Sequence, residues 1–410
     1  MKRRVVVTGV GAVSPIGNNV SDMWKNAMTG VYGIDFIKSF DTSEHKVKVA
    51  GEVKGFDPCD IMDKMQARRT ARFTQLALAA AHEAFAMSRL DMAEEDASRC
   101  GVNISSGIGG LGVIEEEHSK GIKRGFDKVS PLFVPMAITN MAAGMSAIEF
   151  GFKGSCQCIV TACASATNAI GEAFRQIRDG YQEVMMTGGA ESCVSELGIG
   201  GFTSMKALSE TNQPERASIP FDKERDGFVM GEGAGVLILE EYEHALARGA
   251  EILAEVVGYG VNCDANHMTA PLEDGSGAAA CMAQAVEDAG IDKTEIGYIN
   301  AHGTSTPMND KCETKAIKET FSEHAYKLAV SSTKSMTGHL LGASGGIEAI
   351  LTISALKDGF LPPTIGYKAP DEDCDLDIVP NKGRKAGIEY AMSNSLGFGG
   401  HNASVIFKKF

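Results

Sequence analysis

The apolar residues of the chain follow two periodicities that alternate along it. Short runs rich in Val and Ile are typical of buried strands, and longer stretches with apolar residues three and four positions apart predict helices. Strands are expected at residues 5–13, 102–109, 183–188, 234–241, 252–261, 296–304, 390–395 and 403–408. Helices are expected at 68–90, within 131–151, at 163–180 and at 242–248. This alternation predicts an α/β fold in which helices cover parallel sheets.

The second part of the chain repeats the order of the first part with little residue identity. The corresponding segments are 252–261 with the first strand, 296–304 with 102–109, 328–346 with the segment around Cys163, and 390–395 and 403–408 with the two strands that close the first part. We therefore expect an N-terminal half at 1–251 and a C-terminal half at 252–410. Because equivalent strand ends would face each other, Cys163 of one half would meet His302 and His339 of the other.

Cys163 stands where a strand is expected to turn into a buried helix. The apolar face of that helix comprises Ala166, Ala169, Ile170, Ala173, Phe174 and Ile177. A thiol at a helix N-terminus lies near unpaired N–H groups and the positive end of the dipole, which lowers the thiol pKa and favours the nucleophilic thiolate. An inert buried cysteine is the alternative for any single cysteine. His302 and His339, both in loops of small residues, favour the nucleophile.

Composition and charge narrow the classes of function. The chain has 410 residues, of which 44% are apolar, and its formal net charge of −14 argues against nonspecific nucleic-acid binding. No apolar run approaches the length of a membrane span. The ten cysteines follow no disulfide or zinc spacing, which indicates reduced thiols and a cytoplasmic location. We expect neither a metal site nor a cofactor.

Four segments resemble the signature motifs of one enzyme family. They are Thr161-Ala-Cys-Ala-Ser-Ala, Ala301-His-Gly-Thr-Ser-Thr-Pro, Lys334-Ser-Met-Thr-Gly-His-Leu-Leu-Gly-Ala-Ser-Gly and Asn394-Ser-Leu-Gly-Phe-Gly-Gly-His-Asn. From end to end, the chain resembles the β-ketoacyl-acyl-carrier-protein synthases of the thiolase superfamily. The resemblance implies a duplicated, five-layered α/β/α/β/α fold. One departure is His401, because the family usually carries a threonine there.

The resemblance implies a decarboxylative Claisen condensation that elongates fatty acids. Cys163 would accept an acyl group from acyl carrier protein, malonyl carrier protein would lose carbon dioxide, and the product would be a 3-oxoacyl carrier protein. The resemblance assigns the oxyanion hole to the backbone N–H groups of Cys163 and Phe398. His302 and His339 would hold the enolate as neutral imidazoles, and the division of work between them is left open.

The resemblance also assigns supporting residues. Lys334 and Glu348 would orient the two histidines, although a surface ion pair is the alternative reading of both. Thr304 and Thr306 would hydrogen-bond the pantetheine arm of the carrier.

Further residues are assigned to the acyl pocket. The segments that contain Ile108 and Phe202 resemble most closely those of the type II synthases of bacterial fatty-acid elongation. Both residues would lie along this pocket. Phe133 would reach the pocket from a second subunit, so the resemblance implies a homodimer. An ordinary core residue is the alternative for Ile108.

The acyl carrier protein implied as partner is acidic, so an enzyme of net charge −14 needs local positive charge to bind it. A solvated basic face is the alternative for every candidate. The candidates are Arg68, Arg69 and Arg72 on one predicted helix, and Lys123, Arg124, Lys128 and Lys206 elsewhere.

Other classes of function stay open. A non-catalytic partner subunit related to ketosynthases would lack the nucleophile, but Cys163 is present. A cysteine hydrolase or a zinc protein would need an orienting Asn or Asp motif or local metal spacing, and neither is found. Within the enzyme class, a type I elongation synthase or a polyketide ketosynthase would differ mainly in pocket shape.

Overall fold

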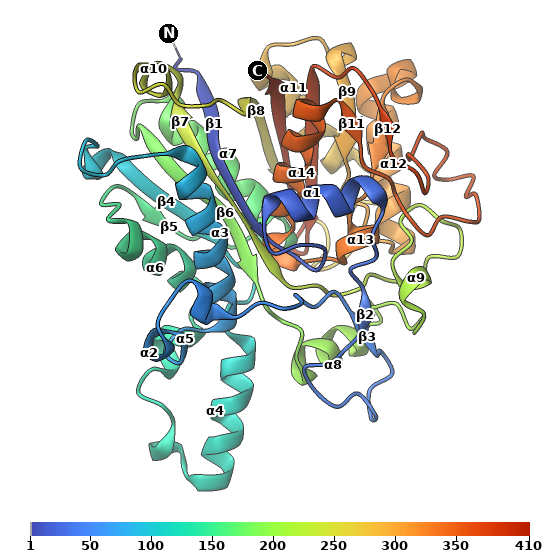
Figure 1. Cartoon of the computed structure of the whole chain (residues 1–410). Helices are drawn as coiled ribbons and strands as arrows, with labels where there is room; N and C mark the ends of the chain where they lie inside the picture. Colours follow the sequence, from blue (N-terminus) through green and yellow to red (C-terminus); the bar gives the residue numbers. More distant parts are fainter. Residues whose placement is uncertain (1) are drawn as a thin grey trace.

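The computed structural model describes residues 2–410, and in that range a ten-stranded sheet runs through the molecule (Figure 1). Its strands are β1 (Val5–Val13), β4 (Cys100–Ser105), β5 (Cys156–Gln157), β6 (Val184–Glu191), β7 (Gly233–Glu241), β8 (Ala254–Cys263), β9 (Ile296–Asn300), β10 (Ala329–Ser331), β13 (Tyr390–Gly397) and β14 (His401–Lys409). Two short pairs lie outside this sheet, namely β2 (Asp35–Phe36) with β3 (Val49–Ala50) and β11 (Phe360–Leu361) with β12 (Arg384–Lys385).

The order of strands across the sheet is β10-β9-β13-β14-β8-β1-β7-β6-β4-β5. The two central strands, β1 and β8, pair antiparallel, with Val5 opposite Val256. Outward from this pair, β7-β6-β4-β5 on one side correspond to β14-β13-β9-β10 on the other. The topology therefore confirms the duplicated α/β arrangement that the order of segments predicted.

The sheet is mixed, so the prediction of parallel sheets is confirmed for only some of the strand pairs. β4 lies parallel to β5 and β6, and β9 lies parallel to β10 and β13. In contrast, β7 lies antiparallel to β1 and β6, and β14 antiparallel to β8 and β13. The connection from β13 to β14 spans only residues 398–400. So short a turn can join only antiparallel neighbours.

Helices form three layers around the two sheet halves, which gives the predicted five-layered fold. The two central helices, α7 (Ser165–Arg178) and α14 (Ser344–Asp358), contact each other and strands of both halves. One outer layer holds α3 (Arg72–Ser88) and α6 (Met141–Phe150), and the other holds α11 (Ser276–Ala289) and α12 (Pro307–Phe321). In Figure 1, α4 (Leu111–Arg124) projects from the body of the molecule.

Two predicted helices differ from the observed ones. The helix expected at 68–90 is α3, which begins only at Arg72 and follows a separate short helix, α2 (Lys64–Ala67); Arg72 binds the Glu232 carboxylate at 2.6–2.8 Å. The helix expected within 131–151 is α5 (Phe133–Ala137) followed by α6. Here the break frees the Ala137 carbonyl to accept the Gly110 N–H at 3.0 Å.

The remaining helices are short or lie at the edges of the layers. They are α1 (Val20–Thr29), α8 (Glu196–Ser204), α9 (Pro214–Ala217), α10 (Tyr242–Ala247) and α13 (Lys334–Thr337). No helix within residues 2–410 is long and apolar enough to cross a membrane. The predicted boundary between residues 251 and 252 falls between α10 and β8, and this boundary stays a prediction.

Glycines allow the central helices to approach their neighbours closely. A Cβ on Gly345 would lie 2.1 Å from the Thr167 hydroxyl on α7, and a Cβ on Gly346 would lie 2.4 Å from the Gly235 carbonyl on β7. Real Cβ atoms do not come so close, so these positions of α14 require glycine. The close contact brings the N-terminal ends of α7 and α14 together in the middle of the molecule.

Candidate active site

A cavity of about 370 Å³ lies where the two halves meet, at the N-terminal ends of α7 and α14. Predicted site residues from both halves line it, namely Cys163, Phe202, Lys206, His302, Thr304, Thr306, His339 and Phe398. The duplication therefore does bring the cysteine to the two histidines. Their roles in a reaction stay predictions.

The turn that carries Cys163 is strained and held in place by side chains. Ala162 has a φ of 50°, a left-handed conformation that a non-glycine residue adopts only when its surroundings enforce it. The Ser165 hydroxyl supplies part of that constraint, since it donates to the Ala162 carbonyl at 2.6 Å and accepts the Thr161 N–H at 2.9 Å. A short 3₁₀ turn, Ala162–Ala164, then leads into α7, so the predicted helix begins close to Cys163. The strand expected before it is only the exposed β5.

The electrostatics of Cys163 differ from the prediction. Burial raises the pKa of its thiol to about 12, a larger effect than the lowering by the Lys334 charge and by the backbone N–H groups of Phe398 and Cys163. The prediction of a lowered thiol pKa is wrong because the residue is only 8% exposed, and desolvation outweighs the helix dipole. The resting group is a thiol, which needs a base when it reacts.

The loop between β13 and β14 reaches the nucleophile turn. A Cβ on Gly397 would lie 2.7 Å from the Thr161 carbonyl and 3.3 Å from the Cys163 nitrogen. Only glycine permits this approach, which places the Phe398 N–H beside the thiol. His401, the departure from the family pattern, lies at the start of β14 with its ring against Gly399 of the same loop.

The two histidines are buried and uncharged. Their ring centroids are 5.2 Å apart, and the planes are nearly perpendicular. Burial, and then the nearby Lys334 charge, hold the pKa of both imidazoles well below the ordinary value. His339 Nδ1 shares a hydrogen bond of 2.8 Å with the Ser344 hydroxyl, whereas His339 Nε2 and His302 Nδ1 have no partner among residues 2–410. Neutral rings with free nitrogens can donate hydrogen bonds to a negatively charged oxygen.

Lys334 and Glu348 form an ion pair in the interior rather than at the surface. Their side chains are 1% and 3% exposed, and the Lys334 ammonium donates to the Glu348 carboxylate. Burial raises the pKa of Glu348, and Lys334 opposes that rise. The ammonium acts on both histidines through its charge. The hydrogen bond of Lys334 goes to Glu348, and the orienting role of the pair stays a prediction.

Sequence reasoning missed the carboxylates that fix the histidine loop. Glu313, buried on α12, accepts the backbone N–H groups of His302 and Gly303, each at 2.8 Å, and burial raises its pKa to about 7. Asp310, one turn earlier, accepts the Ser305 N–H at 3.2 Å. Ser305 has a φ of 73°, so this loop is strained as well. The available signal was a pair of acidic residues three positions apart on a helix face that is otherwise apolar.

Two predicted pocket residues do not line the cavity. Ile108 packs against an apolar cluster that contains Cys163, Cys193 and Phe202, so it lies behind the cysteine rather than in the open cavity. Phe133 lies at the start of α5 and is also absent from the cavity of its own chain. The assignment of Phe133 to a second subunit stays a prediction.

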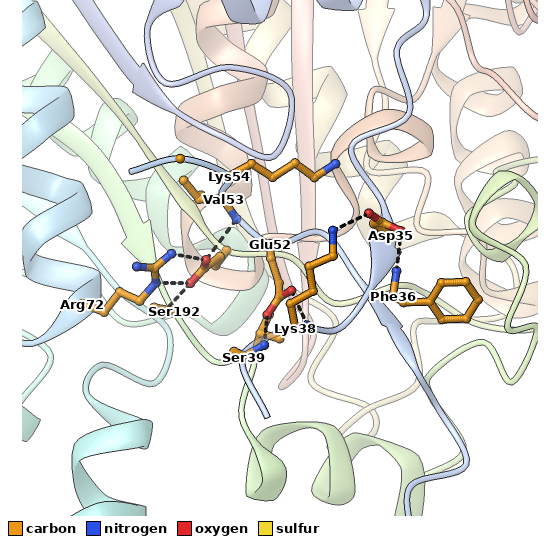
Figure 2. Close-up of a pocket in the computed structure, with 12 residues that line it drawn as sticks. Asp35, Phe36, Lys38, Ser39, Glu52, Val53, Lys54, Arg72 and Ser192 are labelled. Carbon is orange, nitrogen blue, oxygen red and sulfur yellow. Dashed lines mark hydrogen bonds and ion pairs between the residues drawn. The ribbon is translucent and has the colours of Figure 1, made fainter. Parts of the chain in front are cut away.

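The basic residues proposed for carrier docking divide into free and bound groups. Arg68, Arg69 and Lys128 are at least partly exposed, and Lys206 stands at the cavity. Arg72 differs, because its Nε and Nη2 donate to the two carboxylate oxygens of Glu232 (Figure 2). We therefore remove Arg72 from the set of free basic residues.

Comparison with known proteins identifies the family. Residues 2–245 match the N-terminal domain of beta-ketoacyl synthases, and residues 253–368 match their C-terminal domain. The chain belongs to the beta-ketoacyl synthase family.

Relatives match the chain over its full length. It is 53% identical to 3-oxoacyl-[acyl-carrier-protein] synthase 2 of Staphylococcus aureus strain COL, over 100% of this chain and 99% of that protein. It is 51% identical, at the same coverage, to the protein of that name from a Synechocystis strain.

Solved structures agree. A beta-ketoacyl synthase from Burkholderia phymatum matches with a TM-score of 0.92 and 36% identity, and covers 100% of both chains. A type II polyketide ketosynthase, solved with its acyl-carrier protein, matches with a TM-score of 0.93 and 35% identity at the same coverage.

The lowered pKa of the two histidines can be measured directly. In protein labelled with ¹⁵N-histidine, the His302 and His339 signals should not titrate between about pH 6 and 8, whereas an unperturbed imidazole titrates near 6.5. In the double variant Lys334→Gln/Glu348→Gln, which leaves no buried charge unpaired, both pKa values should rise because the ammonium is gone. They should stay below the ordinary value because burial remains. Titration of either ring near 6.5 in the unmodified protein would contradict this account.

Proposed function

We propose that the protein is an acyltransferase that elongates fatty acids by decarboxylative condensation of malonyl carrier protein with a Cys163-bound acyl group. The observation that carries the proposal is the meeting, in one cavity, of a buried thiol, two backbone N–H groups and two neutral imidazoles. Each of the three steps of the reaction uses one or more of these parts.

The first step transfers the acyl group. The Cys163 sulfur attacks the thioester carbonyl of acyl carrier protein, a carbon–sulfur bond forms to Cys163, and the carrier thiol leaves with the proton. Because the resting thiol is protonated, a neighbouring imidazole with a free nitrogen takes the proton as the attack proceeds. The N–H groups of Cys163 and Phe398 stabilise the oxyanion, and such a donor contributes roughly 3 kcal/mol.

The second and third steps form the carbon–carbon bond. Malonyl carrier protein loses carbon dioxide, and the two neutral imidazoles donate hydrogen bonds to the resulting enolate oxygen. The enolate carbon then attacks the Cys163 thioester, the bond to the Cys163 sulfur breaks, and the released thiolate takes up from solvent the one proton that the condensation consumes. The products are 3-oxoacyl carrier protein, carbon dioxide and free carrier protein. Thr304 and Thr306, whose hydroxyls are 3.0 Å apart at the cavity, would bind the pantetheine arm.

Fatty-acid elongation is favoured over polyketide synthesis by the comparisons. The relatives at 51–53% identity carry the name 3-oxoacyl-[acyl-carrier-protein] synthase 2. The polyketide ketosynthase is only 35% identical to this chain. The absence of a cofactor requirement and the cytoplasmic location expected from the sequence remain part of this proposal.

We expect a homodimer because large apolar side chains are exposed on one group of helices. These residues are Ile122 on α4, Val134 on α5, Ile148 on α6, and Phe126 between α4 and α5, all at least 60% exposed. Exposed apolar groups of this size mark protein interfaces. The outermost strand β5 ends the sheet on the same side of the molecule, next to α6. Phe133 on α5 would then lie in the interface, as the second-subunit assignment requires.

The central test is to map the acyl group. After incubation with an acyl carrier protein thioester, mass spectrometry should find the acyl group on Cys163. The Cys163→Ala variant should lose condensation completely but retain some malonyl decarboxylation, because the histidines, not the thiol, hold the enolate. Acylation at another residue would overturn the proposal. Equal and complete loss of both activities on one preparation would contradict the division of roles.

Carrier docking is tested by charge reversal. The double variant Arg68→Glu/Lys128→Glu should raise the Michaelis constant for carrier-bound substrate by about tenfold and flatten its salt dependence, because it removes local attraction for an acidic partner. Pantetheine thioesters without the protein should react as before. Lys382→Glu/Lys385→Glu, an exposed pair in the other half, makes the same change in net charge and is the matched control. An equal effect on pantetheine substrates would remove the docking role.

Chain length is tested at Ile108. Enlarging it to Phe overpacks the cluster behind Cys163, which destabilises the packing by roughly 1–3 kcal/mol. The penalty grows with the length of the acyl chain that must fit. Ile108→Phe should still accept short primers, while long primers should fail to acylate Cys163. Acylation rates across a primer series measure this. A uniform loss at every length would place Ile108 outside the acyl pocket.

A further inference from the structure

Glu191, the last residue of β6, is buried beneath the loop that carries Ile108. Its carboxylate accepts the backbone N–H groups of Gly107 at 2.7 Å, Ile108 at 3.2 Å and Gly109 at 3.3 Å. It also accepts the Ser106 hydroxyl at 2.8 Å. One side chain therefore fixes four consecutive residues of the loop.

The same carboxylate reaches into the other half of the molecule. It accepts the Gly342 N–H at 3.0 Å, in the turn that leads from His339 to α14. A Cβ on Gly342 would lie 2.7 Å from the carboxylate and 2.2 Å from the Gly107 nitrogen. A Cβ on Gly107 would lie 2.8 Å from the carboxylate. The loop, the turn and the carboxylate thus meet at a point that admits no side chain on either glycine.

The chemistry of this contact is unusual for a buried acid. All six hydrogen-bond donors to Glu191 among residues 2–410 are neutral: four backbone N–H groups, the Ser106 hydroxyl and the Cys193 thiol. A buried carboxylate without a basic partner depends on such donors for its stability. The donors in turn lose their acceptor if the carboxylate is removed, so the contact fixes both the loop that carries Ile108 and the turn at Gly342.

The position of Glu191 is itself secured by the next residue. The Ser192 hydroxyl donates to Glu232 at 2.7 Å, and Arg72 donates to both oxygens of the Glu232 carboxylate through its Nε and Nη2 (Figure 2). These groups line a cleft that is separate from the cavity of Cys163. The end of β6 therefore cannot follow the loop if the loop shifts.

We propose that Glu191 is a positioning residue that locks the acyl-pocket loop, residues 106–109, to the turn after His339, residues 340–343. The acyl pocket and one of the two decarboxylating histidines would then share a single support. This inference rests on the proposed function for its kinetic consequences. Its structural content, the coupling of two loops, does not depend on that function.

The test uses Glu191→Gln, which keeps the shape but replaces an acceptor oxygen with an NH₂ group that faces N–H donors. Hydrogen–deuterium exchange should become about tenfold faster in both segments, 106–109 and 340–343. Acylation by a long primer and malonyl decarboxylation should both fall about tenfold in kcat. The Michaelis constant for carrier-bound substrate should change less than about twofold, because the carrier does not touch this site.

The matched control is Glu240→Gln, another fully buried carboxylate, at the opposite end of the adjacent strand β7. It should lower stability without changing exchange in either segment. Ser106→Ala, a smaller change, should give the same pattern in weaker form and keeps the test valid if Glu191→Gln does not fold.

Unchanged exchange, or faster exchange in only one segment, would overturn the coupling. The same loosening in Glu240→Gln would also overturn it, because the effect would then be global. Exchange needs no activity, so failure of the unmodified protein to condense would overturn the proposed function alone.

Discussion

The site depends on the close contact between two buried helices, one from each half. α7 and α14 lie between the sheets, and glycines at 345 and 346 let α14 approach the Thr167 hydroxyl and the Gly235 carbonyl more closely than any larger residue allows. Because the N-terminal ends of both helices lie together, this contact places the turns before them side by side. A larger residue at either glycine would separate Cys163 from the histidine side of the cavity before it touched any reacting group.

Burial that follows from this packing sets the protonation states of the site. Burial raises the pKa of the thiol and lowers the pKa of the two imidazoles, and both shifts favour the neutral form. The Lys334–Glu348 ion pair, whose ammonium charge lowers the pKa of both histidines, is itself sealed from solvent. Neutral groups lose little free energy of hydration when they are buried. Because the buried site screens charge weakly, its hydrogen-bond donors interact strongly with the negative charge that forms during a reaction.

Sequence reasoning predicted the duplicated topology and the grouping of Cys163 with His302 and His339, because both depend on patterns that recur along the chain. It failed where long-range packing decides. The lowered thiol pKa followed from a local argument about a helix end, but the depth of the cavity reversed its sign. Arg72 looked like its neighbours Arg68 and Arg69, yet it pairs with a residue 160 positions away. Glu191 carries no local motif, and Glu313 is marked only by its spacing from Asp310, so only the folded chain shows what the two glutamates hold.

The duplication also explains why only one half carries a nucleophile. Each half has the same strained turn before its central helix, with Ala162 at a φ of 50° in the first and Leu341 at 47° in the second, each opening a 3₁₀ turn. The position after Ala162 is Cys163, and the position after Leu341 is Gly342. A side chain at 342 would collide with the Gly107 nitrogen, which the Glu191 carboxylate holds in place. The second turn therefore has glycine, with no side chain, at the position of the cysteine, and it supports the loop of the first half instead. The repeated scaffold thus builds one reacting thiol beside two histidines.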